Sequence, residues 1–368
     1  MLKQYKGRLL SSVEPTTSAS SASGMWTLEE YMQAKQAGLW PSGAGLFNFT
    51  SFTFTHGNQN GPIGPTLAQL SYNTIAHPFV SNPSYFSVTS GIQYFTVPAT
   101  GLYDIEVAGA SSVRQVYSST SSNTYGRGAR FKIRTQLTSG QILKILIGQL
   151  PSSAQNYGSA GNPYTGQSPT DGNCFAGGGG ATIIALDDNT PIVVAGAGGS
   201  NRTQYPCNSQ TNIDASTNLS ASPTWPGNPG GNGGSPVAGG TSGLGGVYIS
   251  SDQGTAGAGF TGNGDQGASV FSGYTSARSF VNGGSGAIAV GIGGNVPQPS
   301  GGFGGGGAGG WGGSGGGGGY SGGGAGSNNG SDAYGGGGSN FIRTGSTVVT
   351  GHSYHTGSGF ATITAVVA

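Results

Sequence analysis

The chain has 368 residues, of which 77 are glycine and only 7% are charged, and its formal net charge is +1. This charge balance excludes the basic surface that proteins use to bind nucleic acid or anionic lipid. The 34% of hydrophobic residues predicts a folded core rather than a disordered chain. No apolar run reaches the length of a membrane-spanning helix, and the N-terminus lacks the apolar stretch of a secretory signal.

Residues 1–44 are predicted to form an N-terminal arm, in which residues 1–24 are extended because they are rich in Ser and Thr and show no periodicity. A short helix follows, since Thr27 and Glu30 form a capping box and Gly38 suits the position after the last turn. Such a short helix is marginal alone. Its apolar residues therefore need a partner surface, either on the same domain or on another protein: Trp26, Tyr31, Met32, Leu39 and Trp40.

From residue 45 to residue 368 the pattern predicts one domain of β-strands separated by turns. Apolar and polar residues alternate in 47–54 and 129–137, as in strands with one buried face. A turn cluster occupies 60–66, and further strands are predicted within 91–111, 141–149, 181–199, 339–345 and 359–367. Strands at this spacing predict an all-β fold, an antiparallel sandwich or jelly roll.

Glycine tracts lie between the predicted strands, and the richest covers residues 301–338. A flexible linker is one interpretation of such a tract, and a glycine/aromatic segment that condenses is another. The favoured interpretation is a bundle of polyglycine II helices, which bond to one another and have no room for a Cβ atom. Strands tether the tract at both ends, and aromatic residues recur inside it at Phe303, Trp311, Tyr320 and Tyr334, of which the first three are assigned to the scaffold.

The motifs that could carry chemistry are weak. Gly196-x-Gly198 follows a predicted strand but lacks the third glycine and the helix of a dinucleotide site. His352 and His355 lie in a predicted Gly/Ser loop, where a structural pair is favoured over a metal site. Carboxylates are too sparse to nominate an acid and a base. The sequence therefore predicts a protein that is not an enzyme and binds no cofactor.

Two cysteines, Cys174 and Cys207, leave a disulfide and free buried thiols as open alternatives. Aromatic residues among glycines are candidates for receptor contact, because planar rings give a large contact area at low entropic cost. The candidates are Trp225, Tyr248 and Tyr274, whereas Trp311 and Tyr320 are assigned to grooves between glycine segments.

Several of these segments, in this order, resemble the glycine-rich domain of the anaplastic lymphoma kinase and leukocyte tyrosine kinase ectodomains. The matching stretches are 61–69, 91–110, 141–149, 176–184, 191–199 and 301–329. The resemblance implies a TNF-like β-sandwich with an inserted bundle of polyglycine II helices, used by those receptors to bind ligands. This chain departs from them because it shows no transmembrane helix, kinase domain or cysteine-rich pattern.

Similar glycine-rich domains occur in virus and phage structural proteins, and residues 25–41 resemble segments of phage virion proteins. The expected function is therefore a virion protein, with residues 1–44 docked on other virion proteins and the sandwich facing outward. A tail fibre or tip adhesin that binds a host glycan or protein is favoured. A head decoration or cement protein and a cellular extracellular binding module are the alternatives, and a homotrimer is compatible with the resemblance.

Overall fold

The structure is a computed structural model, and it describes only part of the chain. The described residues are 3–5, 8–11, 16–18, 21–23, 29, 32–33, 45–113, 125–152, 176–201, 210–219, 226–230, 237–248, 254–266, 274–289, 299–310, 313–326 and 334–366. Within these ranges the protein is nearly all β and contains two large antiparallel sheets, which confirms the predicted all-β sandwich. No helix in this part of the chain is long and apolar enough to cross a bilayer.

The first sheet has five strands in the order β14-β9-β8-β15-β5. Its strands are β5 (Ser51–Phe54), β8 (Gly101–Ala108), β9 (Gly128–Leu137), β14 (Thr347–His355) and β15 (Phe360–Ala365). Strands β8 and β9 alternate buried and less buried residues, because one face meets the core and the other meets solvent. The solvent face carries a charge ladder that includes the Arg134–Asp104 pair at 2.6 Å.

The second sheet has six strands in the order β13-β12-β11-β10-β7-β6. Its strands are β6 (Phe86–Thr89), β7 (Ile92–Thr96), β10 (Ile142–Leu146), β11 (Thr182–Leu186), β12 (Pro191–Ala195) and β13 (Phe341–Ile342). Strands β11 and β12 are almost continuously buried, as expected for strands covered on both faces.

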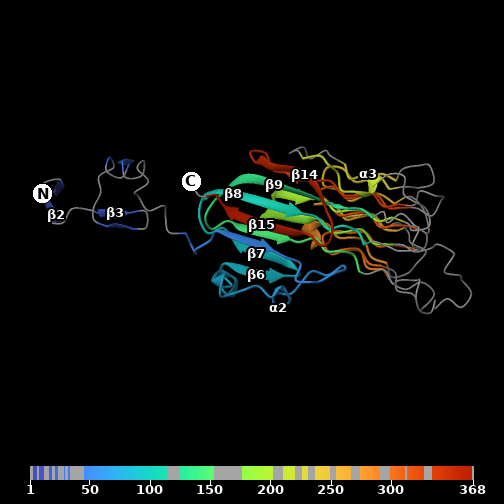
Figure 1. Ribbon diagram of the computed structural model, residues 1–368, viewed down its shortest axis with the longest axis horizontal. Coiled ribbons are helices and arrows are strands. Elements are labelled where there is room, and N and C mark those ends of the chain that lie inside the picture. The colour runs from blue at the N-terminus through green and yellow to red at the C-terminus, as the bar shows by residue number, and fades with distance from the viewer. Residues whose placement is uncertain are drawn as a thin grey trace, which may run out of the picture.

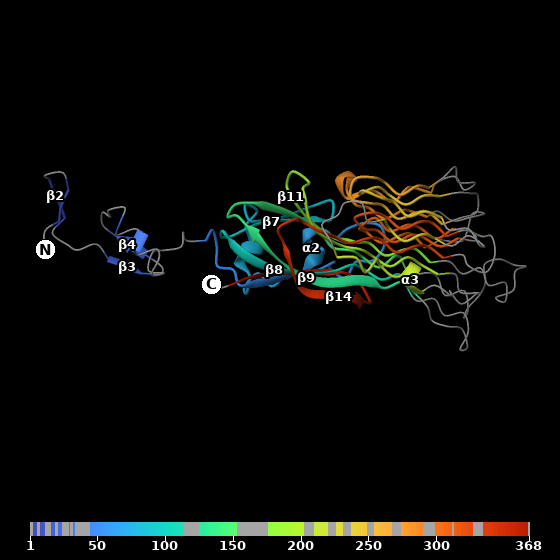
Figure 2. The ribbon, with the colours of Figure 1, turned by 90° about the horizontal axis from the view of Figure 1, so that it is seen from above.

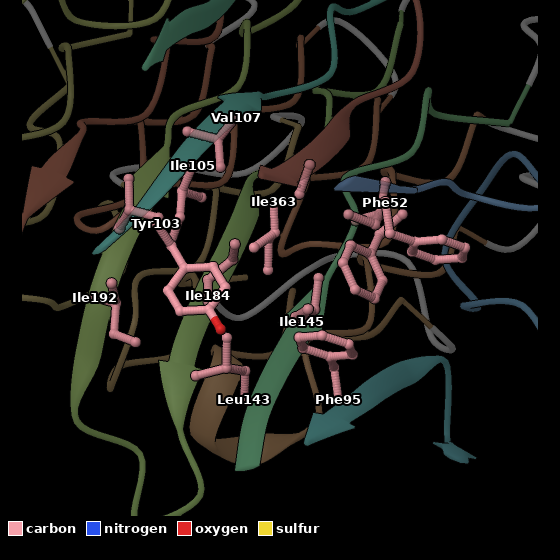
Figure 3. Close-up of a cluster of buried hydrophobic side chains, with 14 of the residues drawn as sticks. Phe52, Phe95, Tyr103, Ile105, Val107, Leu143, Ile145, Ile184, Ile192 and Ile363 are labelled. Carbon is pink, nitrogen blue, oxygen red and sulfur yellow. The ribbon is translucent and has the colours of Figure 1, made fainter. Parts of the chain in front are cut away.

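The core fills the space between the two sheets, and Figure 3 shows side chains from both sheets meeting there. Ile105 of β8, Leu143 of β10 and Ile184 of β11 are fully buried within it. The segment before β5 also contributes, since Phe47 stacks on Phe79 with ring centroids 4.9 Å apart. The sequence predicted a strand over 47–54, whereas the strand begins at Ser51 and the preceding residues cross the end of the sandwich as an irregular segment.

The glycine segments continue the strands beyond one end of the sandwich, which Figures 1 and 2 show from two directions. Six of the segments are direct extensions of strands β8 to β13: 109–113, 125–127, 147–152, 176–181, 196–201 and 334–340. The others lie beside them as 213–219, 226–230, 237–240, 243–248, 254–260, 261–266, 274–279, 284–289, 299–303, 304–310, 313–319 and 321–326. These segments together are called the glycine bundle below.

Segment 313–319 lies inside the bundle and is hydrogen-bonded to six other segments. Its backbone bonds reach 176–181, 196–201, 254–260, 304–310, 321–326 and 334–340. Examples are the bonds from Gly318 N–H to Gly179 O at 3.0 Å and from Gly317 N–H to Gly336 O at 2.8 Å. Bonds that leave a segment in several directions are those expected of polyglycine II helices, which make none internally.

A stack of aromatic rings joins the bundle to the outer face of the second sheet. Phe280 stacks on Phe260 at 5.0 Å, Phe260 on Tyr320 at 6.0 Å, and Tyr320 on Phe341 of β13 at 4.5 Å, measured between ring centroids. Phe303 is buried in the same cluster with Ile183 of β11. The sheet is therefore covered on one face by the first sheet and on part of the other face by the bundle.

Short elements complete the structure. In the arm, β1 (Lys3–Tyr5) pairs with β2 (Arg8–Ser11), and β3 (Thr16–Ser18) pairs with β4 (Ser21–Ser23), whereas the sequence predicted an unpaired extended segment. Of the predicted arm helix, the described residues Glu29, Met32 and Gln33 are helical. Elsewhere in the described ranges, the short helices are α2 (Leu67–Leu70), η1 (Pro78–Ser81), α3 (Gln210–Ile213) and η3 (Phe280–Asn282).

Candidate binding site

The aromatic residues predicted to contact a receptor have different surroundings. Tyr248 is half-buried at the end of segment 243–248. Tyr274 is buried and its hydroxyl donates a hydrogen bond to the carbonyl of Gly309 at 3.2 Å. The ring of Tyr274 packs among alanines of the glycine segments and presents little surface, which does not favour the predicted receptor contact. Trp225 lies outside the described residues.

The residues assigned to the scaffold fit the bundle where the structure describes them. Phe303 is 1% exposed and Tyr320 is 9% exposed, and both belong to the cluster that covers the second sheet. Tyr334 is also buried, and its hydroxyl accepts a hydrogen bond from Asn212 Nδ2 at 2.9 Å. Trp311 lies outside the described residues, so its scaffold role stays a prediction.

The predicted anchoring residues belong mostly to the undescribed part of the arm. Met32 is described and is 49% exposed, which leaves its side chain available to a partner. Trp26, Tyr31, Leu39 and Trp40 lie outside the described residues, and so do Cys174 and Cys207.

The described ends of several bundle segments lie at one end of the molecule. Segments 109–113, 147–152 and 196–201 run away from the sandwich, whereas 125–127 and 176–181 run back to it. The described chain therefore ends and restarts at the end of the bundle remote from the sheets, and the stretches between carry Tyr117, Tyr157, Tyr164 and Tyr205 in their sequences. Sequence reasoning did not select these tyrosines, because only the topology shows that their stretches share one end.

An ion pair between a buried carboxylate and a partly exposed arginine ties segment 213–219 to the residue before β9. Asp214 has a side chain only 1% exposed, and it accepts hydrogen bonds from the backbone N–H of Arg127 at 2.8 Å and from Arg127 Nη2 at 2.6 Å. Hydrogen bonding to Asp214 raises the pKa of Arg127. The guanidinium also lies over the ring of Tyr354, 4.0 Å from its centroid, so this cation has two partners.

The two histidines of the H-x-x-H motif lie on β14 rather than in the predicted loop. Residues 347–350, Thr-Val-Val-Thr, favour a strand because β-branched side chains suit the pleated sheet. His352 packs against Tyr354 with ring centroids 4.8 Å apart, whereas His355 packs against Phe360 at 5.4 Å. Burial lowers the pKa of both histidines. No group of three His, Cys, Asp or Glu side chains that suits a metal ion occurs within the described ranges.

Two grooves are described on the sandwich, one beside the turn between β6 and β7 and one beside β5. The first, about 540 Å³, is lined by residues 63–67, the β6–β7 turn, the turn after η3, and Phe303. The second, about 450 Å³, runs along β5 and is closed on its other side by residues 70–73 and His77.

Comparisons with known proteins leave the chain unassigned. No protein-family model matches it, and no curated protein matches it.

Proposed function

We propose that this protein is a structural protein of a virus particle, most specifically a phage tail fibre or tip adhesin. In this proposal residues 1–44 attach it to other virion proteins, and the connecting stretches at the far end of the glycine bundle contact a host surface glycan or protein. The proposal includes no enzymatic activity and no cofactor.

The opposite placement of arm and bundle carries the proposal. Leu46, directly after the arm, donates its backbone N–H to Pro98 O at 2.8 Å, just before β8 begins at Gly101. The bundle continues from the other end of β8, after Ala108. The arm therefore enters at one end of the sandwich, and the described bundle segments extend from the other end. An attachment protein needs this separation between its anchor and its receptor-binding end.

The chemistry of the connecting stretches also suits recognition. Residues 114–124, 153–175 and 202–209 are rich in Ser, Thr, Asn and Tyr. The same residue types dominate antibody loops, because Tyr supplies a large rigid contact and Ser and Asn supply adaptable hydrogen bonds. A backbone-bonded bundle supplies the rigid base that such loops need.

Two experiments test the two halves of the proposal. The tagged full chain and a variant without residues 1–44 are expressed in cells that produce the particle, and purified particles are probed for the tag. We expect the full chain in particles and the shortened chain outside them. Equal incorporation of both would refute anchoring by the arm, and absence of the full chain from particles would refute the virion assignment.

Receptor contact is tested with the full chain on host cells. The double variant Tyr157→Ala, Tyr164→Ala is expected to weaken binding by at least tenfold, because alanine removes two rings from the same connecting stretch. The control is Ile75→Ala, since Ile75 is 92% exposed on the sandwich and outside the bundle. Host binding that is absent in the unaltered chain would favour the alternative of a head decoration or cement protein.

A further inference from the structure

Strand β5 is an edge strand whose free side can be identified from its hydrogen bonds. Ala365 N–H bonds to Thr50 O at 2.8 Å, and the β5–β15 register pairs Phe52 with Ile363 and Phe54 with Ala361. Bonded pairs alternate with non-bonded pairs in an antiparallel ladder. The backbone N–H and C=O groups of Ser51 and Thr53 therefore point away from β15, toward the open edge of the sheet.

Contacts of neighbouring side chains agree with this assignment. The hydroxyls of Ser51 and Thr364 lie 2.8 Å apart, and those of Thr53 and Thr362 lie 2.9 Å apart. Such close side chains are typical of the non-bonded pairs of a ladder. The next outward group, the N–H of Thr55, already donates to the hydroxyl of Tyr72 at 2.9 Å, which closes one end of the edge.

A groove beside β5 leaves this edge of the sheet accessible to another chain. It has a volume of about 450 Å³ and lies between β5 and residues 70–73, and Ser51, Thr53 and Asn73 line it. A chain lying in this groove would meet two outward N–H groups and two outward C=O groups. Peptides commonly bind to sheet edges in this way, by adding a strand.

In the arm, strands β3 and β4 pair only with each other among the described strands and belong to neither large sheet. Strands β3 and β4 form a two-stranded pair, and such a pair is at best marginally stable in water without a third strand. Their sequence, Thr16–Ser18 and Ser21–Ser23, is uncharged and rich in hydroxyls. The hydroxyl pairs across β5 and β15 form a ladder that a Ser/Thr strand continues, because such residues hydrogen-bond across strands.

We propose that the β3–β4 pair of one copy of this chain adds to the free edge of β5 in a second copy. Residues 24–44 separate the pair from the part of the chain held on the sandwich and span at most roughly 70 Å when extended, which is enough to reach a neighbouring molecule. In both views the pair lies away from the sandwich of its own chain (Figures 1 and 2). Each copy thus donates one element and accepts another, and repetition closes a ring such as a trimer.

This inference does not depend on the attachment function, and its test uses the purified full chain. Sedimentation velocity is measured for the unaltered protein, for Ser51→Pro, for Thr53→Pro, and for a variant lacking residues 1–24. Proline removes an outward N–H that β15 does not use, and edge strands tolerate it at such positions. We expect oligomers for the unaltered chain and a mass near the 36.3 kDa of one chain for the three variants.

Mixing supplies the decisive control. Thr53→Pro still donates its arm, and the variant lacking residues 1–24 still accepts one, so an equimolar mixture is expected to form a complex of two chains. A monomeric unaltered chain, or an oligomer that keeps its mass in either the shortened chain or Ser51→Pro, would overturn the proposal. If Thr53→Pro fails to fold, shown by loss of its melting transition, Ser51→Pro takes its place in the mixture.

Discussion

Replacing Gly323 with valine is the sharpest test of the glycine bundle. A Cβ atom at this position would lie 1.9 Å from the carbonyl oxygen of Gly336, a backbone atom of another segment. Contacts under 3.0 Å do not occur at real Cβ atoms, so the two segments must separate by about 1.1 Å, given the 1.9 Å approach. The same carbonyl accepts a hydrogen bond from Gly317 N–H at 2.8 Å, which this displacement weakens.

The expected cost follows from these two effects. Overpacking a dense interior costs about 1–3 kcal/mol, and losing a hydrogen bond costs about 1 kcal/mol more. A total of roughly 3 kcal/mol lowers the melting temperature of a domain this large by roughly 6 °C. Gly316→Val is expected to act similarly, since its Cβ would lie 2.4 Å from the carbonyl oxygen of Gly323.

Calorimetry of the purified full chain measures the effect. The matched control is Gly351→Val on β14, where an added Cβ meets no atom within 4 Å and where valine suits a strand. An unchanged melting temperature for both bundle variants would refute the packed bundle and would assign these glycines to a flexible linker.

Three further predictions concern other parts of the fold. Arg127→Ala leaves the buried carboxylate of Asp214 without its partly exposed cation but keeps the backbone N–H donor of residue 127, so we expect chemical denaturation to show a loss of roughly 1–3 kcal/mol. Burial lowers the pKa of His352 below 6.5, so folding is expected to weaken as pH falls below 6.5, and His352→Gln should flatten this part of the stability–pH curve. Phe260→Ala removes the ring between Phe280 and Tyr320 in the aromatic stack and is expected to cost roughly 3–5 kcal/mol of unfolding free energy. A cost under about 1 kcal/mol would contradict a packed stack.

The sandwich could be predicted from the sequence wherever one face of a strand is buried. Strands β9 and β15 coincide with segments in which apolar and polar residues alternate. Strands β11 and β12 coincide with two short apolar runs joined by a turn. Strand β14 was missed because Gly351 and the two histidines interrupt its β-branched start. Helix α2 was missed although Thr66 and Gln69 form a capping box, since the glycines and prolines before it favour a turn.

The bundle could be predicted only as a type of packing. Runs of glycine and the tethering strands predict extended segments without room for Cβ atoms. Which segments become neighbours was not predictable, because the bonds that join them are between backbone groups and leave no side-chain pattern. For the same reason Tyr248 and Tyr274 looked equivalent in the sequence, although only Tyr274 lies in a buried gap between segments.

Segment 313–319 is hydrogen-bonded to six neighbouring segments, and this close packing restricts which residues its positions can hold. Every position whose Cβ would strike a neighbouring carbonyl must remain glycine, so the segments themselves cannot diversify. The bonds described for segment 313–319 all join it to other bundle segments, so this constraint applies to the segments themselves. Under the proposed attachment function, new binding specificity is therefore expected to arise outside these segments, where no Cβ atom meets a neighbouring carbonyl.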